Sequence, residues 1–400
     1  MSTAIQGLRG TGQFSIDFRP TNYRELFTLL EPNGSAPLNA LLAMAASEST
    51  DDPKYNNFQD ELPARQMIVN NVGGYPGTGG TQTIQLTAGD PVAYVLAGSV
   101  VVNSRTGEVM QATADGDTVA IAITVTRQIG GTTLTINNGD MLFVAGFAAS
   151  EGSGAPTAIS FDPVVVYNYT QIFKTPFQVT GTLQNTYRRT GNAETEYMTK
   201  ALKLHMSDIE RAMFFGRRVE NNGTTAQPTR FTGGLMNLIT NITDVGTFAT
   251  PGLMDENVFD RTLIENIFAW GSKQKICFGG ARIASLLQQI GKDKWTPRQI
   301  DNAYGILFTR YVTFAGDLLF YLHPQFRQIN GMANTMVVID LPYTKYRFLQ
   351  NRDTRLYRNI QPPDADSVKH QYMTECGLEL LQNRPHAIIK NWTDVTTPPP

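Results

Sequence analysis

Two cysteines, Cys277 and Cys376, are all that the 400 residues contain. This number excludes a disulfide framework and a zinc cluster built from cysteine alone, and we expect two buried thiols in a reducing compartment. The longest apolar run, residues 92–102, is about half of the roughly 20 residues that a membrane-spanning helix needs, and the N-terminus lacks an apolar signal segment. Only 17% of the residues are charged and the net charge is −2, which argues against a dedicated basic nucleic-acid binder.

The common catalytic motifs are also missing. The chain has no G-x-x-x-x-G-K-[ST], H-E-x-x-H, C-x-x-C, G-x-S-x-G or G-x-G-x-x-G pattern. Glycines cluster at residues 73–80, but no lysine follows them and no helix pattern begins there. The cluster therefore favours a hinge over a phosphate-binding loop. We expect a protein that is not an enzyme and that holds no cofactor or metal ion.

The four histidines, His205, His323, His370 and His386, are scattered along the chain. His205 lies three residues before Asp208 in a helical pattern, so the two could form half of a metal site or a base with its orienting acid. No third ligand stands at a motif spacing. We therefore expect a buried, hydrogen-bonded polar pair, and the rival is a hydrolase that uses His205 and Asp208.

Residues 192–218 are predicted to form one long helix. Asn192 is a suitable N-cap, Glu194 and Glu196 would lie in the first turn, and Gly216 can end the helix. At about 1.5 Å per residue the helix would be roughly 39 Å long, enough to cross a domain. The helical period predicts an apolar face of Tyr197, Met198, Ala201, Leu202, Leu204, Met206, Ile209, Ala212, Met213 and Phe215. It predicts a polar face of Glu196, Thr199, Lys200, Lys203, Ser207, Glu210 and Arg211.

The segments on either side of this helix differ in character. Residues 51–177 alternate and are broken by turns, which predicts a small β-barrel or sandwich at about 84–127. After the helix we expect helices at 257–270 and 281–290, a hairpin of 306–314 with 318–322, and strands at 336–341 and 346–349. The C-terminal part is expected to be a hairpin of residues 372–381 with 387–392.

Charge is unevenly distributed along the chain. Residues 55–173 contain three arginines, no lysine and nine acidic residues, a net charge of −6, whereas residues 341–360 carry +4. The basic strip 341–360 alternates with aromatic residues, which is typical of single-stranded nucleic-acid binding and also of an amphipathic sheet with one charged face. A third interpretation pairs the strip with the acidic arm of a neighbouring subunit.

This order of parts resembles the major capsid protein of tailed bacteriophages (the Hong Kong 97 type). The similar segments are 166–173 (VYNYTQIF), 175–177 (TPF), 201–212 (ALKLHMSDIERA), 215–216 (FG) and 232–235 (TGGL). The resemblance implies an α+β capsid fold. Its parts would be an N-terminal arm at 1–45, a long β E-loop at 46–180 carrying the 84–127 insertion, a peripheral domain at 181–250 and 376–395 with the spine helix, an axial domain at 251–375, and a flexible tail at 396–400. Some members cross-link through an E-loop lysine, and residues 55–173 have none.

The resemblance implies a head protein that self-assembles through pentamers and hexamers into an icosahedral or prolate shell around packaged double-stranded DNA. Portal, scaffolding and decoration proteins are further expected partners, no membrane is involved, and the protein would be assembled in the host cytoplasm and become part of the virion. The alternative is a β-rich phage tail or surface carbohydrate-binding protein with residues 84–127 as its recognition module. The candidate intersubunit contacts are Arg65, Tyr167, Arg188, Arg189, Arg217, Arg218, Lys345, Arg347, Arg352, Arg355 and Arg358.

Overall fold

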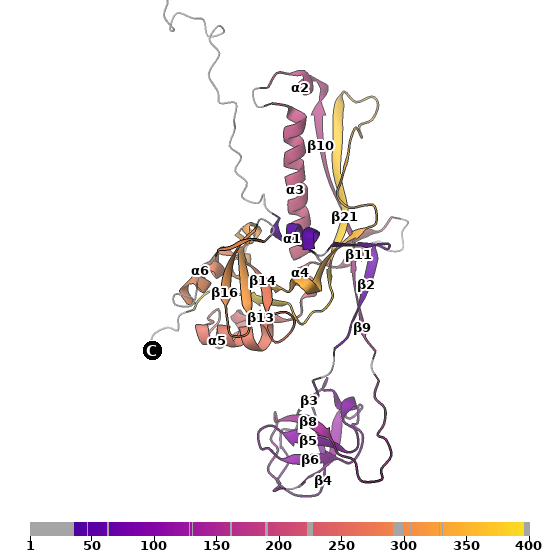
Figure 1. Ribbon diagram of the computed structural model, residues 1–400, viewed down its shortest axis with the longest axis vertical. Helices are drawn as coiled ribbons and strands as arrows, with labels where there is room; N and C mark the ends of the chain where they lie inside the picture. The colour runs from indigo at the N-terminus through magenta and orange to yellow at the C-terminus, as the bar shows by residue number, and fades with distance from the viewer. Residues whose placement is uncertain are drawn as a thin grey trace, which may run out of the picture. The chain divides into compact units, whose positions relative to one another are not determined.

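The computed structural model of the protein describes residues 36–45, 47–61, 64–127, 129, 131–160, 162–188, 191–221, 227–290, 299–303, 306–327, 329 and 331–395. Helices and strands are mixed (Figure 1), which confirms the α+β class. The chain divides into two compact units, one made of Met1–Asn57 with Val165–Pro400 and the other of Phe58–Val164. Of the predicted N-terminal arm, only helix α1 (Pro37–Ala45) and the residue before it are described, and the predicted tail 396–400 lies outside the described residues.

Helix α3 (Ala193–Phe215) is the predicted long helix, and its ends follow the signals in the sequence. The Asn192 side chain accepts a hydrogen bond from the Glu194 N–H at 2.8 Å, as an N-cap should. At the other end, the Gly216 N–H donates to the Ala212 carbonyl at 2.8 Å. We call α3 the spine helix.

The predicted faces of the spine helix are wrong at three positions. Leu204, expected on the apolar face, is 61% exposed, whereas Ser207 and Glu210, expected to face water, are buried. Their partners come from distant segments, because Glu210 bonds to α1 and Ser207 accepts from the side chain of Gln325. Helical periodicity is calculated from residues close together in the sequence, so it cannot identify partners from distant segments.

A five-stranded sheet lies beside the spine helix (Figure 1), and we call it the spine sheet. Its order is β1 (Ser47–Thr50), β19 (Thr344–Leu349), β21 (Ser367–Leu380) and β10 (Gln171–Thr180), with β20 (Arg355–Tyr357) paired to β21. Strands β10 and β21 are antiparallel from the pair Gln171–Cys376 to the pair Thr180–Ser367. The short elements α2 (Gly181–Asn185), β11 (Val219–Asn221), β12 (Thr229–Phe231) and α4 (Leu235–Leu238) follow β10 and the spine helix.

A seven-stranded sheet forms the rest of the first unit. Its order is β13 (Ile242–Asp244), β22 (Ala387–Lys390), β18 (Met336–Ile339), β14 (Gln274–Gly279), β17 (Asp317–Leu322), β16 (Ile306–Val312) and β15 (Gln299–Ala303). Strands β16 and β17 form the hairpin that the sequence predicts. The remaining helical segments are α5 (Glu256–Thr262) with a π turn over Leu263–Ile267, α6 (Ala281–Ile290), and 3₁₀ turns at Val92–Tyr94, Val245–Thr247, Pro324–Arg327, Met332–Asn334 and Leu341–Tyr343.

Both faces of strand β14, in the middle of this seven-stranded sheet, are buried. On β14, the Phe278 ring meets the Phe214 ring of the spine helix at 5.4 Å, edge to face. The preceding residue, Cys277, points to the opposite face of the sheet. Its side chain belongs to a second core, which includes Phe259 of α5 and Leu286 of α6. Because successive residues of a strand point to opposite faces, one strand contributes to two cores.

The predicted C-terminal hairpin is wrong. Strand β21 lies in the spine sheet, whereas β22 pairs with β13 and β18 in the seven-stranded sheet. Strands β19 and β20 also lie in the spine sheet, although residues 251–375 are expected to form an axial domain. Alternation along the chain identifies a strand, but the sheet that it joins is decided by partners far away in sequence.

The second unit, Phe58–Val164, is a closed β-barrel. Its strands run in the order β3 (Gln66–Ile68), β8 (Met141–Phe147), β5 (Ser99–Asn103), β6 (Val109–Ala112), β7 (Ala122–Thr126) and β4 (Thr81–Gln85). An antiparallel bridge between Val69 and Leu86 joins the first strand to the last, and the Thr87 N–H donates to the Ile68 carbonyl at 2.9 Å. A barrel is one of the two architectures that the sequence predicts, and it extends beyond 84–127 on both sides because β3 and β8 are needed to close it.

The barrel interior is filled by apolar side chains. The buried residues are Met67, Val69, Tyr75, Ile84, Leu86, Val92, Val95, Val101, Met110, Ala112, Ile123, Val125, Ile136 and Leu142. Tyr75, in the middle of the glycine cluster 73–80, is bridged to Ile136 and is only 6% exposed. The prediction of a hinge at 73–80 is therefore wrong, because this segment is part of the packed barrel.

Candidate assembly site at the root of the β arm

The β arm consists of strand β2 (Lys54–Gln59), the barrel unit and strand β9 (Val164–Tyr169), and β2 and β9 pair as a two-stranded ribbon. Hydrogen bonds fix the base of the ribbon to the C-terminal end of β21. The Tyr55 Oη donates to the Leu378 carbonyl at 2.8 Å. Burial raises the pKa of Tyr55 well above its ordinary value, so the phenol stays protonated and can donate this bond.

Asn168 of β9 provides the second attachment. Its Nδ2 donates to the carbonyls of Leu378 at 2.7 Å and Gly233 at 3.0 Å, and its Oδ1 accepts from the Gly233 N–H at 2.8 Å. The residue is 3% exposed, and both ends of its amide are engaged. One side chain thus ties β9 to β21 and to the loop that follows β12.

Gly377 leaves the space that this attachment needs. A Cβ atom at position 377 would lie 2.5 Å from the Tyr55 Oη, 2.6 Å from the Tyr169 carbonyl and 3.0 Å from the Thr232 Oγ1. No side chain larger than hydrogen fits without displacing the ribbon. A glycine inside an alternating strand pattern signals such a close approach of backbone, and it is the signal by which the sequence could have located this root.

Tyr167 and Arg218, two of the predicted contact residues, lie together within the chain. The Arg218 guanidinium is 4.3 Å from the centre of the Tyr167 ring, and its Nη1 donates to the Tyr167 carbonyl at 2.8 Å. The Lys54 ammonium group is 4.4 Å from the same ring. Two cations on one aromatic ring stiffen the base of the ribbon.

The basic strip 341–360 begins on β19, where its first two cations are paired within the chain. Lys345 Nζ lies 2.5 Å from Glu48 on β1, and Arg347 contacts Glu48 at 3.0 Å and Glu379 on β21 at 2.5 Å. The hydrogen bond from Lys345 is the main cause that lowers the pKa of the Glu48 carboxyl. These contacts agree with the interpretation of a sheet with one charged face.

The other candidate contact residues are distributed as follows. Arg352 pairs with Glu375 at 2.6 Å, and Arg188 pairs with Glu196 of the spine helix at 2.7 Å. The side chains of Arg65, Arg217, Arg355 and Arg358 are exposed, and Arg189 lies outside the described residues. The structure brings Lys345 and Arg347 to the spine sheet with their acidic partners, and it places Arg352 in the turn after β19, beside Glu375.

His205 and Asp208 do not form the expected buried pair. His205 is fully buried between β10 and β21, with Nδ1 2.9 Å from the Thr175 hydroxyl and Nε2 2.7 Å from the Thr374 hydroxyl. Burial lowers its pKa. Asp208 is 54% exposed and lies 3.7 Å from Arg211. Residues three apart are only about 60° apart around the helix axis, so the edge of the buried face runs between His205 and Asp208.

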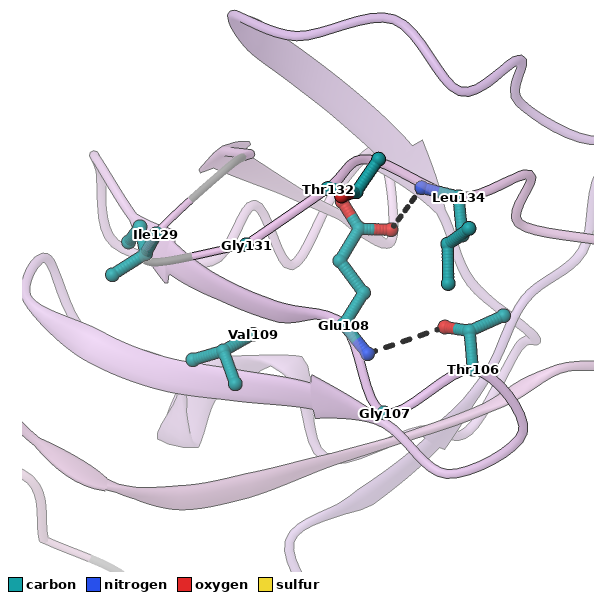
Figure 2. A pocket seen from close by; sticks show the side chains of 8 residues that line it. All are labelled: Thr106, Gly107, Glu108, Val109, Ile129, Gly131, Thr132 and Leu134. Atoms are coloured by element: carbon teal, nitrogen blue, oxygen red, sulfur yellow. Dashed lines mark hydrogen bonds between the residues drawn. The ribbon is translucent and has the colours of Figure 1, made fainter.

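A shallow cavity of about 310 Å³ opens in the barrel beside Glu108, between the β5–β6 turn and residues 129–134 (Figure 2). Glu108 is already bound, because Arg127 donates to both of its carboxylate oxygens at 2.8 and 2.6 Å. The Leu134 N–H donates to it as well, at 3.3 Å (Figure 2). A carboxylate engaged in this way is poorly suited to acid–base chemistry, and we assign the cavity no ligand.

Within the residues that the structure describes, no three His, Cys, Asp or Glu side chains are placed to hold a metal ion together. Likewise, no helix within them combines the length and the apolar character needed to cross a membrane.

The comparisons with known proteins identify the family. The family model "SU10 major capsid protein" matches residues 10–393. The major capsid protein of Pseudomonas phage PaMx41 is 28% identical over 338 residues, which cover 81% of this chain and 78% of that protein. Among solved structures, the capsid of an empty GTA particle is similar at 10% identity and a TM-score of 0.44, covering 93% of this chain and 94% of that one.

A second similar structure is the SrpI encapsulin of Synechococcus elongatus PCC 7942, at 12% identity and a TM-score of 0.42, covering 60% of this chain and 79% of that one. The match to the family model over nearly the whole chain favours a capsid protein over a tail or surface carbohydrate-binding protein. The chain belongs to the SU10 major capsid protein family, and it is a structural component of a phage virion that forms the capsid shell.

Proposed function

We propose that copies of this capsid protein assemble as pentamers and hexamers into a closed icosahedral or prolate shell, and that the β arm of one copy lies over the next. The supporting observation is the apolar surface of the ribbon, where Phe58, Val164 and Val165 are 71%, 66% and 52% exposed. A two-stranded ribbon is at best marginally stable alone in water, and large apolar side chains left exposed on it favour a protein interface. In a shell made of identical subunits, the surface that can bury these side chains belongs to another copy of the protein.

In this proposal the exposed cations make a second contact. Arg65, Arg217, Arg355 and Arg358 are exposed and can reach another copy as direct contacts. The β arm carries a net charge of −6 over residues 55–173 and has no lysine there, so it offers the complementary charge. Lys345, Arg347, Arg352, Arg188, Tyr167 and Arg218 would act by holding their own sheet, ribbon or helix in place.

The domain plan is proposed on the same basis. The spine helix and the spine sheet correspond to the peripheral domain, the seven-stranded sheet to the axial domain, and residues 1–45 to the N-terminal arm. The E-loop, predicted at 46–180, corresponds to the β arm, because β1 and β10 belong to the spine sheet. The packaged double-stranded DNA would be held without base recognition, through phosphate charge alone. Portal, scaffolding and decoration proteins are proposed partners, with assembly in the host cytoplasm.

We further propose that the subunit carries out no catalysis. The strongest candidate for a catalytic group, His205, is fully buried and bound on both ring nitrogens by threonine hydroxyls. A general base must reach a substrate proton, and this imidazole has no such access. The change His205→Ala is expected to lower stability and to abolish no turnover.

The test of the arm contact compares two valines of the β arm. Val164→Asp places a charge on the ribbon, and Val72→Asp places the same charge on a turn of the barrel where the side chain is 93% exposed. We expect Val164→Asp to remain a folded subunit that forms few or no shells, because the carboxylate would be buried against the next copy. Val72→Asp should assemble like the wild type. Negative-stain microscopy and sedimentation count the particles, and wild-type yields of closed shells from Val164→Asp would refute the proposed contact.

A further inference from the structure

Glu210 of the spine helix is a fully buried carboxylate that binds the first turn of a distant helix. Its Oε1 accepts from the Leu38 N–H at 2.9 Å, and its Oε2 accepts from the Asn39 N–H at 2.8 Å. Leu38 and Asn39 are the second and third residues of α1, and they are 172 and 171 positions away in sequence. Both oxygens of the carboxylate are thus engaged by backbone.

Helix α1 needs this partner because its own sequence supplies none. The N–H groups of the second and third helical residues are those that an N-cap side chain normally satisfies. The residue before α1 is Ala36, whose side chain has no acceptor. Glu210 replaces the missing cap and places a negative charge at the positive end of the helix dipole.

A third donor comes from the seven-stranded sheet. His323, which follows β17, lies with its Nε2 2.9 Å from Glu210 Oε1, and its Nδ1 accepts from the Gln325 N–H at 3.3 Å. The proton therefore resides on Nε2, and the imidazole donates to the carboxylate. The ring is fully buried and packs edge to face against Phe214 at 4.8 Å.

We propose that Glu210 is a latch that fixes α1 to the spine helix and to the end of β17, and so determines where the N-terminal segment joins the body of the subunit. Residues 1–36 come before α1 in the sequence, so the position of α1 fixes the C-terminal end of that segment. Of the three donors to Glu210, two belong to α1. If α1 moved away, the carboxylate would keep His323 alone of these donors and the Leu38 and Asn39 N–H groups would lose their acceptor, which makes undocking of α1 unfavourable.

The apolar contacts of α1 work together with the latch. Leu38, Leu41 and Leu42 are at most 1% exposed and belong to the same core as Ile209 and Met213 of the spine helix. Apolar burial alone is not directional and would tolerate a helix that slides or turns. The two hydrogen bonds from consecutive N–H groups fix both the register and the direction of α1.

Amide hydrogen exchange on the unassembled full-length subunit tests the latch. Glu210→Gln keeps the shape but removes the charge and turns an NH₂ group toward a backbone N–H. We expect the amides of α1 to exchange about 10-fold to 100-fold faster, the factor that corresponds to one or two charge-assisted hydrogen bonds. The matched control is Glu196→Gln on the same helix, whose partners are Arg188 and Lys200, and it should leave α1 unchanged.

A rescue variant separates a latch from a general loss of stability. Ala36→Asp supplies a local N-cap, so the double variant Ala36→Asp with Glu210→Gln should restore slow exchange in α1. If Glu210→Gln alone is insoluble, the double variant should recover soluble protein. Unchanged exchange in α1 after Glu210→Gln, equal acceleration over the whole unit, or failure of the double variant to rescue would overturn the proposal. Because the readout is made on single subunits, it does not depend on the proposed arm contact.

Discussion

The buried ion pair in the barrel gives the sharpest prediction for stability. Arg127 and Glu108 have side chains that are 0% and 2% exposed, joined by two parallel hydrogen bonds of 2.8 and 2.6 Å. Arg127 also donates to the Pro76 carbonyl at 2.6 Å. The change Arg127→Met would leave Glu108 buried, with only the Leu134 N–H at 3.3 Å. Breaking a buried pair by removing one partner costs about 3–5 kcal/mol, so we expect a loss of that size in the barrel.

A double variant shows whether the loss comes from the unpaired charge. Replacing both partners, as in Arg127→Met with Glu108→Leu, removes the stranded carboxylate and should be less destabilising than Arg127→Met alone. The comparison is Arg105→Met, whose side chain is 47% exposed and whose partner Asp140 keeps hydrogen bonds from the Asn103 side chain and the Asn137 N–H, so we expect a smaller loss than for Arg127→Met.

The assay is amide hydrogen exchange at core strands of the barrel, such as Met110 of β6 and Val125 of β7, with Phe278 of the other unit as internal reference. Each 1.4 kcal/mol of lost stability should speed exchange about tenfold at the barrel amides when they exchange by unfolding of that unit. Equal effects of Arg127→Met and Arg105→Met, or a double variant as costly as the sum of its single changes, would refute the reasoning.

Three further predictions concern the first unit. Gly377→Ala should destabilise it by about 2–4 kcal/mol in chemical denaturation, through overpacking and a lost hydrogen bond to Tyr55, whereas Gly154→Ala, which has no atom within 4 Å of its Cβ position, should have little effect. Burial, together with the charge of Lys275, lowers the pKa of His386 from 6.5 to about 3. Its neutral form therefore contributes stability that is complete above pH 6.5 and is lost as the pH falls toward 3, by about 1.4 kcal/mol per pH unit. His386→Gln should reduce that slope, and an unchanged slope would contradict the assignment. Tyr167→Leu should cost about 1–2 kcal/mol by removing two cation–π contacts, and a loss below about 0.3 kcal/mol in the same denaturation assay would count against the contact.

Local signals in the sequence predicted local structure well. Asn192 and Gly216 mark the ends of the spine helix because a cap requires only the residues beside it. The same holds for the hairpin of β16 and β17, whose strands are separated by a short turn. Structural features that depend only on a few adjacent residues, such as helix caps and short turns, can therefore be predicted from the sequence.

The candidate site depended on distant contacts and was predicted only in part. Lys345 and Arg347 were expected to be important charges, but their partners, Glu48 and Glu379, lie on strands about 300 and 30 residues away and could not be identified from spacing. Glu210 looked like a surface residue because its partners are backbone groups of α1, which no side-chain pattern reveals. The barrel was recognised as a module, yet its limits were set too narrowly, since closure requires strands from both ends of the insertion.

The join between β3 and β4 affects how the subunit behaves at high concentration. An open sheet presents a row of unpaired peptide groups along its outer strands, and identical chains crowded together can add to one another there without limit. In this barrel the Val69–Leu86 bridge connects the two strands that would otherwise be outermost. Many subunits can therefore be concentrated during assembly with less risk that their barrels polymerise into fibres through sheet edges.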